Sequence, residues 1–95
     1  MQPITSESIF VAADNQVSCD VDDEAALLNL DTGVYYGLNP LGAYVWKLVQ
    51  SPVTFGVLRD RLCAEFPDQQ NIEQDLRQFL DEMFQAGLVL VDQPR

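Results

Sequence analysis

The spacing of apolar and polar residues changes once along the chain, near Asn39. Before this point, the apolar residues recur at every second position, which is typical of half-buried strands. After it, they recur at every third or fourth position, which is typical of helices packed along one face. The pattern therefore predicts a strand-rich first part followed by a helical part.

Three segments before residue 39 have strand patterns, and the third folds back to form two strands. Ile9 to Ala12 is a short apolar run that ends at the turn signal Asp14-Asn15. Residues 17–22 and 26–38 alternate, and the second stretch folds back at Asp31-Thr32-Gly33, where the glycine can take a positive φ. The residues expected to face the core in this hairpin are Ala26, Leu28, Leu30, Val34, Tyr36 and Leu38, with Tyr35 and Gly37 on the other face.

Helix signals begin directly after the hairpin. Asn39-Pro40 is a start signal, with asparagine as N-cap and proline at the first helical position, and this helix is expected to end near Gln50. Thr54 can cap a second helix that Pro67-Asp68 ends. The third helix is predicted from about Asn71 to Ala86, with Gly87 after its end, and Leu88 to Val91 is a last strand or packed tail.

This order of elements predicts an α+β fold. We expect a winged-helix-like arrangement, in which an N-terminal three- or four-stranded antiparallel sheet is followed by three helices. The 95 residues are expected to form a single domain over residues 1–95, with a core of about 8–91.

The net charge narrows the range of partners. The chain carries 15 acidic and 5 basic residues, for a formal charge of −10. Such a surface repels nucleic acid and anionic lipid, and it favours a peptide with some positive charge. No apolar run is long enough to span a membrane, and the start Met-Gln-Pro-Ile-Thr-Ser-Glu has no features of a secretory signal, so we expect a cytoplasmic protein.

The sequence carries no catalytic constellation, so we expect no enzymatic activity. It has no histidine, no nucleophile motif and no phosphate-binding glycine pattern. Cys19 and Cys63 are expected to be small buried thiols. The run Asp22-Asp23-Glu24 lacks the spacing of a calcium loop, so we expect a solvated surface, no metal and no cofactor.

The third helix has an unusually broad apolar face. Two interpretations are open: the helix lies between two neighbours, or part of its face floors a groove. Ile72, Leu76, Phe79 and Met83 set the core direction, Leu80 and Phe84 lie to one side as the candidate floor, and Glu73 and Arg77 lie on the same flank as its candidate rim.

The strand at residues 34–38 is the last of its set and is expected to be a sheet edge. No charged residue occurs from Thr32 to Tyr44, although proteins usually protect exposed edges with charges or proline. An unprotected edge beside an apolar helix flank is suited to binding a peptide as an added strand. The same edge can pair with a second copy, so we expect a monomer or weak homodimer.

The stretch LLNLDTGVYYGLNPLGAYVWKLV resembles the PqqD-like family. Three motifs carry the resemblance, together with the later helix spacing and Gly87-Leu88-Val89, over roughly residues 8 to 91. They are Leu28-Asn29-Leu30-Asp31-Thr32-Gly33, Leu38-Asn39 and Val45-Trp46.

The resemblance implies a non-enzymatic recognition element that binds the leader of a ribosomally made precursor peptide as an antiparallel strand. It is most similar to the stand-alone leader-binding subunit of lasso-peptide biosynthesis, which implies a partner leader peptidase, transglutaminase-like, and a cyclase. The alternative is a PqqD-type peptide chaperone for a radical enzyme. The implied leader-binding residues are Val34, Tyr35, Tyr36, Gly37, Leu38, Glu73, Leu76, Arg77, Leu80 and Phe84.

Two other functions are weighed against this one. A winged-helix DNA-binding protein needs a basic recognition helix, but the third helix has Arg77 against four acidic residues. A structural partner subunit would have a broad protein-binding surface and would bind no leader.

Overall fold

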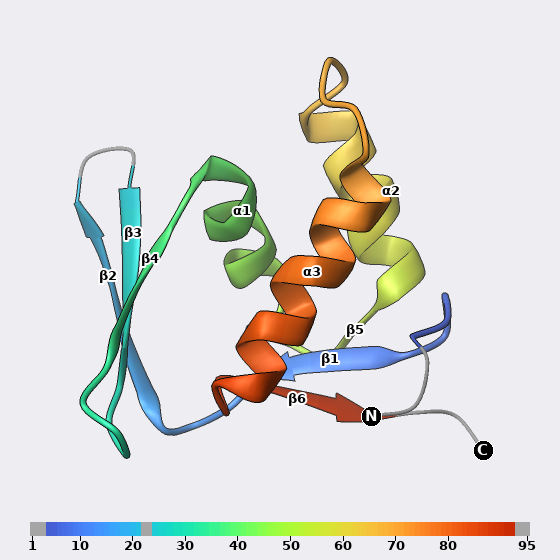
Figure 1. Cartoon of the computed structure of the whole chain (residues 1–95). Coiled ribbons are helices and arrows are strands. Elements are labelled where there is room, and N and C mark those ends of the chain that lie inside the picture. The colour runs from blue at the N-terminus through green and yellow to red at the C-terminus, as the bar shows by residue number, and fades with distance from the viewer. Residues whose placement is uncertain (1–3, 22–23, 93–95) are drawn as a thin grey trace.

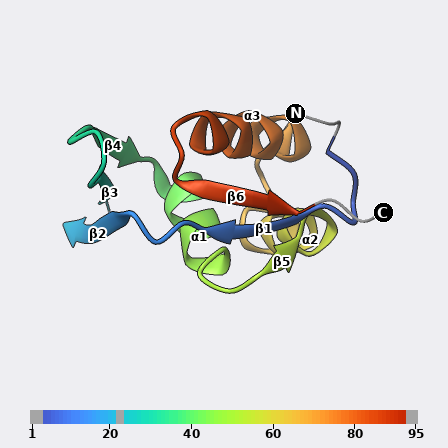
Figure 2. The same cartoon turned by 90° about the horizontal axis from the view of Figure 1, so that it is seen from below.

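The computed structural model describes residues 4–21 and 24–92. Within these residues, the strands form two three-stranded antiparallel sheets. The first sheet gathers strands from both ends of the chain and the middle, in the order β5 (Val53–Thr54), β1 (Ile9–Ala12) and β6 (Val89–Asp92). It lies below the helices in Figure 1 and nearest the viewer in Figure 2.

The second sheet contains the predicted hairpin and stands beside the first helix (Figure 1). Its order is β2 (Gln16–Val21), β3 (Glu24–Asn29) and β4 (Tyr35–Leu38). The α+β class, the antiparallel strands and the three helices are confirmed in the described residues. A fourth strand does not join this sheet: β1 instead pairs with β5 and β6, and the Ala13 amide after it donates to the Leu88 carbonyl (2.9 Å).

The helices of the described part are α1 (Pro40–Leu48), α2 (Phe55–Glu65) and α3 (Ile72–Gln85). Both predicted side-chain caps are present. The Asn39 Oδ1 atom accepts from the Gly42 amide (2.7 Å), and the Thr54 hydroxyl oxygen accepts from the Val57 amide (3.3 Å). These oxygens satisfy amides that have no partner inside the helix.

The end of α3 has the hydrogen bonds of a Schellman motif. Gly87 has φ +76°, its amide donates to the Phe84 carbonyl (3.0 Å), and the Leu88 amide donates to the Met83 carbonyl (2.9 Å). A glycine is suited to this left-handed position because it has no Cβ. The motif turns the chain sharply into β6, which continues from Val89.

The core lies where the helices meet the two sheets. Fully buried aromatic and aliphatic side chains come from both sheets and all three described helices, among them Phe10, Leu27, Val45, Phe55, Leu58, Leu62, Leu76, Leu80 and Leu88. One connected cluster therefore holds the second sheet against the helices.

The predicted faces of β3 are wrong. Ala25, Leu27 and Asn29 face the core, whereas Leu28 is half-buried and Leu30, beyond the strand, is 57% exposed. Apolar residues occupy both faces of this strand, so the alternation did not fix which set is inside, and a shift of one residue exchanges the faces. Val34 is also exposed and precedes β4, whereas Tyr36 and Leu38 face inward as predicted.

The prediction of a buried Cys63 is also wrong. Its side chain is exposed on α2, because the core face of that helix is formed by Phe55, Leu58 and Leu62. The predictions for the Cys19 side chain and for Asp22 and Asp23 lie outside the described residues.

Candidate functional site

The outer edge of β4 has no partner among the described strands, as predicted, because β4 is the last strand of its sheet and pairs with β3. The Asn29 amide donates to the Val34 carbonyl (3.0 Å). Residue pairs in an antiparallel ladder alternate between those that exchange main-chain hydrogen bonds and those that do not. From this starting pair, Tyr36 and Leu38 bond toward β3, and the main-chain groups of Tyr35 and Gly37 point to the free edge.

The turn before β4 fixes this register. Gly33 has φ +74°, and its amide donates to the Asn29 carbonyl (2.8 Å). Together with the bond from the Asn29 amide to Val34, this is the pattern of a β-bulge with glycine at its left-handed position. The predicted positive φ at Gly33 is confirmed. A bulge of this kind inserts one residue and so sets which residues of β4 face outward.

Asn29 also holds the hairpin against α3. Its side chain is 2% exposed, and its Oδ1 atom accepts from the amides of Asp31 (2.9 Å) and Thr32 (3.3 Å). Its Nδ2 atom donates to the Ala86 carbonyl at the end of α3 (2.8 Å). One side chain therefore joins the turn of the β4 hairpin to the helix that lies opposite the β4 edge.

A groove lies between the β4 edge and α3. We call it the β4–α3 groove. Its wider part, about 430 Å³, is lined by Tyr35, Tyr36, Gly37, Leu38, Asn39, Phe79, Glu82 and Met83. A narrower part, about 220 Å³, is lined by Asn39, Leu41, Gln69, Asp75, Gln78, Phe79 and Glu82. The two parts share Asn39, Phe79 and Glu82, so they are continuous along the helix.

Phe79 is held at the groove by a close contact with α1. A Cβ atom placed on Gly42 would lie 2.9 Å from the Phe79 ring. Glycine at position 42 thus lets the ring pack closely on α1 while part of the ring stays exposed to the groove. The Phe79 ring gives this side of the groove exposed apolar surface, and the largely buried Met83 (4% exposed) also lines it.

Of the predicted strand residues, Tyr35, Tyr36, Gly37 and Leu38 border the groove, whereas Val34 precedes β4 and lines neither part. The predicted helix residues occupy other places. Leu76 and Leu80 are 0% exposed, so the expectation that Leu80 floors a groove at the surface is wrong. The expectation fails because the hydrophobic core covers more of α3 than the central row of apolar residues, and Leu80 lies within it. Tyr35 is 73% exposed beside the free edge, and Leu38 is buried beneath it.

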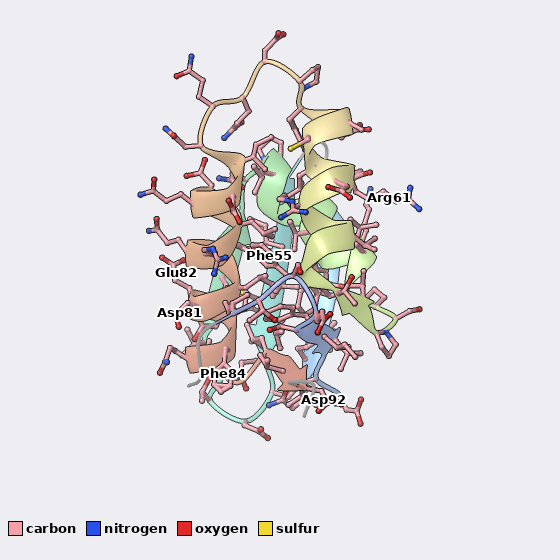
Figure 3. All side chains as sticks on the ribbon, turned by 90° about the vertical axis from the view of Figure 1, so that its right-hand side faces the viewer. Phe55, Arg61, Asp81, Glu82, Phe84 and Asp92 are labelled. Atoms are coloured by element: carbon pink, nitrogen blue, oxygen red, sulfur yellow. The ribbon has the colours of Figure 1, made fainter. Side chains whose placement is uncertain are left out.

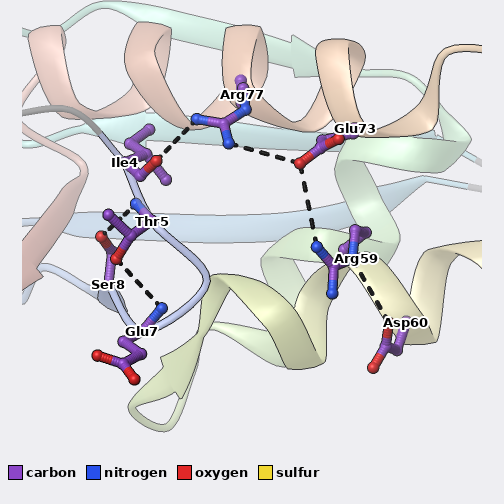
Figure 4. Close-up of polar contacts among 8 residues, drawn as sticks. All are labelled: Ile4, Thr5, Glu7, Ser8, Arg59, Asp60, Glu73 and Arg77. Atoms are coloured by element: carbon purple, nitrogen blue, oxygen red, sulfur yellow. Dashed lines mark hydrogen bonds and ion pairs between the residues drawn. The ribbon is translucent and has the colours of Figure 1, made fainter.

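Glu73 and Arg77 face α2 and the N-terminal segment rather than β4 (Figure 4). The Arg77 guanidinium donates to the Ile4 carbonyl (2.9 Å), lies 4.7 Å from the centre of the Phe55 ring, and pairs with Glu73 (3.4 Å). Glu73 is also 4.0 Å from Arg59. These contacts anchor the start of the described chain, so the two residues do not rim the β4–α3 groove.

Helix geometry explains the difference. At about 100° per residue, Phe84 shares the flank of Glu73 and Arg77, whereas Glu82 lies roughly 140–160° away from Arg77 and Phe84. In Figure 3, Glu82 extends from the side of α3 remote from α2, and Phe84 lies near the end of the helix. The sequence analysis found a broad apolar face but had no signal for which flank meets β4, so it missed Phe79, Glu82 and Met83 as groove residues.

The described residues contain no group of histidine, cysteine, aspartate or glutamate side chains that could hold a metal ion. Nor does any helix among them have the length and apolar character needed to cross a membrane.

Comparisons with known proteins gave one family and two solved structures. Residues 24–89 match the family model of coenzyme PQQ synthesis protein D, PqqD. The structure of TbiB1 in complex with the TbiA(beta) leader peptide is 35% identical, with a TM-score of 0.74, over 83% of this chain and 93% of that chain. Lasso peptide synthetase B1 complexed with the leader peptide shares the fold at 18% identity, with a TM-score of 0.72, over 85% of this chain and 96% of that chain. A comparison with curated proteins gave no match.

Proposed function

Because the chain belongs to the PqqD family, we propose that it binds the leader segment of a ribosomally synthesised precursor peptide by β-strand addition on β4. The observation that carries the proposal is the unpaired edge of β4 beside the β4–α3 groove. The similarity to TbiB1, which is solved with a leader peptide, supports it.

The geometry gives each part of an added strand a role. The main-chain groups of Tyr35 and Gly37 would hydrogen-bond to the leader and set its register. Leader residues opposite Tyr36 and Leu38 would project to the same face as these side chains, which is the face of the groove. Their side chains would pack on Phe79 and Met83, so apolar leader residues at alternate positions would fit best.

We propose that the protein has no enzymatic activity of its own and acts in the cytoplasm, where precursor peptides are made. It would present the bound leader to a leader peptidase and other enzymes of lasso-peptide maturation, including a cyclase. A second candidate is a PqqD-type peptide chaperone for a radical enzyme, which the description of the matching family favours.

The test is a titration of the protein into fluorescein-labelled TbiA(beta) leader peptide, followed by fluorescence anisotropy. Saturable binding, competed by unlabelled leader but not by a scrambled peptide of the same composition, is expected. Equal competition by the scrambled peptide, or no binding, would contradict leader recognition. Adding candidate peptidase and radical enzymes to the complex then distinguishes the two maturation pathways by which enzyme binds it.

A further inference from the structure

The two parts of the β4–α3 groove are lined by different residues. Its wider part is bordered by the apolar side chains of Leu38, Phe79 and Met83 and by Tyr36, but the surface it exposes is more polar than apolar. Its narrower part adds Leu41, Gln69, Asp75 and Gln78. Glu82 lines both parts, and no lysine or arginine lines either of them. A peptide that fills the whole groove therefore meets Glu82 in both parts and Asp75 only in the narrower part.

Asp75 and Glu82 differ from two other acidic side chains on the helices, Asp60 and Glu73. Asp60 and Glu73 each lie in an ion pair with an arginine. Within the described residues, Asp75 and Glu82 have no ion pair. The Asp75 carboxylate accepts from the Gln69 side-chain amide (3.0 Å), and the Glu82 carboxylate accepts from that of Gln78 (3.4 Å). Among the described residues, no basic side chain therefore pairs with either carboxylate, on a protein whose net charge is −10.

The direction of β4 relates these carboxylates to one end of the ligand. β4 runs from Tyr35 to Leu38 and continues to Asn39, which borders the polar part of the groove. A strand added antiparallel to β4 runs the opposite way. Its residues just before the paired segment would therefore enter the narrower part, beside Asp75 and Glu82. Its paired residues would lie in the wider part, which Phe79, Met83 and again Glu82 line.

We propose that the protein selects leader peptides in which lysine or arginine residues immediately precede the apolar, strand-forming segment, and that Asp75 and Glu82 are the specificity-determining residues. This inference rests on the proposed function. It adds the charge of the ligand, the end of the ligand that carries it, and the two residues that recognise it. Because both carboxylates are partly or fully solvent-accessible, each ion pair is expected to contribute modestly to affinity.

The probes are four labelled versions of the TbiA(beta) leader peptide. In three of them, the three residues before the strand-paired segment are all lysine, all glutamine or all glutamate. In the fourth, the lysine triplet follows the paired segment. Against the parent protein, we expect the order lysine, glutamine, glutamate, with the first two differing by about 2- to 25-fold, since each exposed pair contributes a factor of roughly 1.5 to 5.

Three variants separate local recognition from overall charge. The double variant Asp75→Asn with Glu82→Gln should remove most of the preference for the lysine peptide. Asp81→Asn, on the same helix but outside the groove lining, should leave it unchanged and is the matched control. Glu82→Lys should reverse the order of the lysine and glutamate peptides. Circular dichroism confirms that each variant is folded.

Several outcomes would overturn the inference. These are equal binding of the lysine and glutamine peptides, an equal effect of Asp81→Asn and the double variant, or tighter binding of the peptide with its lysines after the paired segment. If all peptides bind through β4 without a charge preference, the proposed function stands and this inference fails. If none binds, the proposed function fails and takes the inference with it.

Discussion

Asn29 has more structural consequences than its place at the end of a strand indicates. Its buried side chain accepts hydrogen bonds from the main-chain amides of Asp31 and Thr32 in the hairpin turn. It also donates one to the carbonyl of Ala86, directly after α3. Asn29 belongs to the Leu-Asn-x-Asp-x-Gly motif. This motif therefore positions the elements that form the groove and does not line the groove itself. We infer that the relative position of β4 and α3 depends on this residue.

Asn29→Ala should destabilise the protein by about 1–3 kcal/mol, because three main-chain groups lose a partner and the site is buried. The matched control is Asn15→Ala in the same region, which removes an exposed bond to Asp31 and should cost less than about 1 kcal/mol. Urea unfolding followed by circular dichroism measures both free energies of unfolding. Equal losses would show that the three buried hydrogen bonds of Asn29 contribute no more than the exposed bond of Asn15.

Phe79 and Phe84 form a matched pair on opposite flanks of α3. Both are half-buried, but Phe79 borders the groove and Phe84 does not. Phe79→Ala should weaken leader binding by about 1–3 kcal/mol, roughly 5- to 150-fold, because an apolar anchor is lost. Phe84→Ala should bind nearly as the parent does. The anisotropy titration gives both dissociation constants, and the reverse order would place the leader on the α2 side of the helix.

At the scale of elements, the edge strand carries the binding argument. Gly37→Pro removes an amide donor at the free edge without removing a hydrogen bond to β3, a position at which edge strands tolerate proline. It should weaken leader binding by about 3- to 10-fold or more, because one hydrogen bond is lost and the ring obstructs the added strand.

Gly37→Ala is its control. The added Cβ would have no heavy atom within 4 Å, and the amide donor is kept. Leader affinity close to that of the parent is therefore expected in the same titration. If proline and alanine at this position bind the leader alike, main-chain pairing at residue 37 is not part of recognition.

The free edge also predicts how the protein associates without leader. An uncharged edge can pair with the same edge of a second copy. Any dimer seen by analytical ultracentrifugation should therefore dissociate as leader peptide is added. A dimer that persists at saturating leader would use another surface.

Features that depend on neighbouring residues could be predicted from the sequence, whereas those that depend on distant contacts could not. Both capping residues, the glycine after α3 and the glycine in the hairpin were identified from the sequence, because each satisfies a local requirement of the backbone. The inward face of β3 could not be identified from the sequence, because both of its faces carry apolar residues. The first strand joined a different sheet because its partners, β5 and β6, lie far away in the sequence.

At the scale of the whole molecule, two elements from different parts of the chain form the walls of the groove. The edge of β4 was predicted from its place in the strand order, and the structure confirms it. The flank of α3 that lines the groove was not predicted, because tertiary packing decides which side of an amphipathic helix meets the sheet. Arg77 and Glu73 have plausible chemistry for a rim, but their contacts with Ile4 and Arg59 place them on the other side.

The most direct test of strand addition on β4 is amide hydrogen exchange at single residues, measured by NMR with and without saturating leader peptide. Exchange at Tyr35 and Gly37 should slow by about tenfold or more, because their amides gain partners. Tyr36 and Leu38, already bonded toward β3, should change less. Unchanged exchange at Tyr35 and Gly37, with slowed exchange instead around Arg77 on the α2 side, would contradict the account.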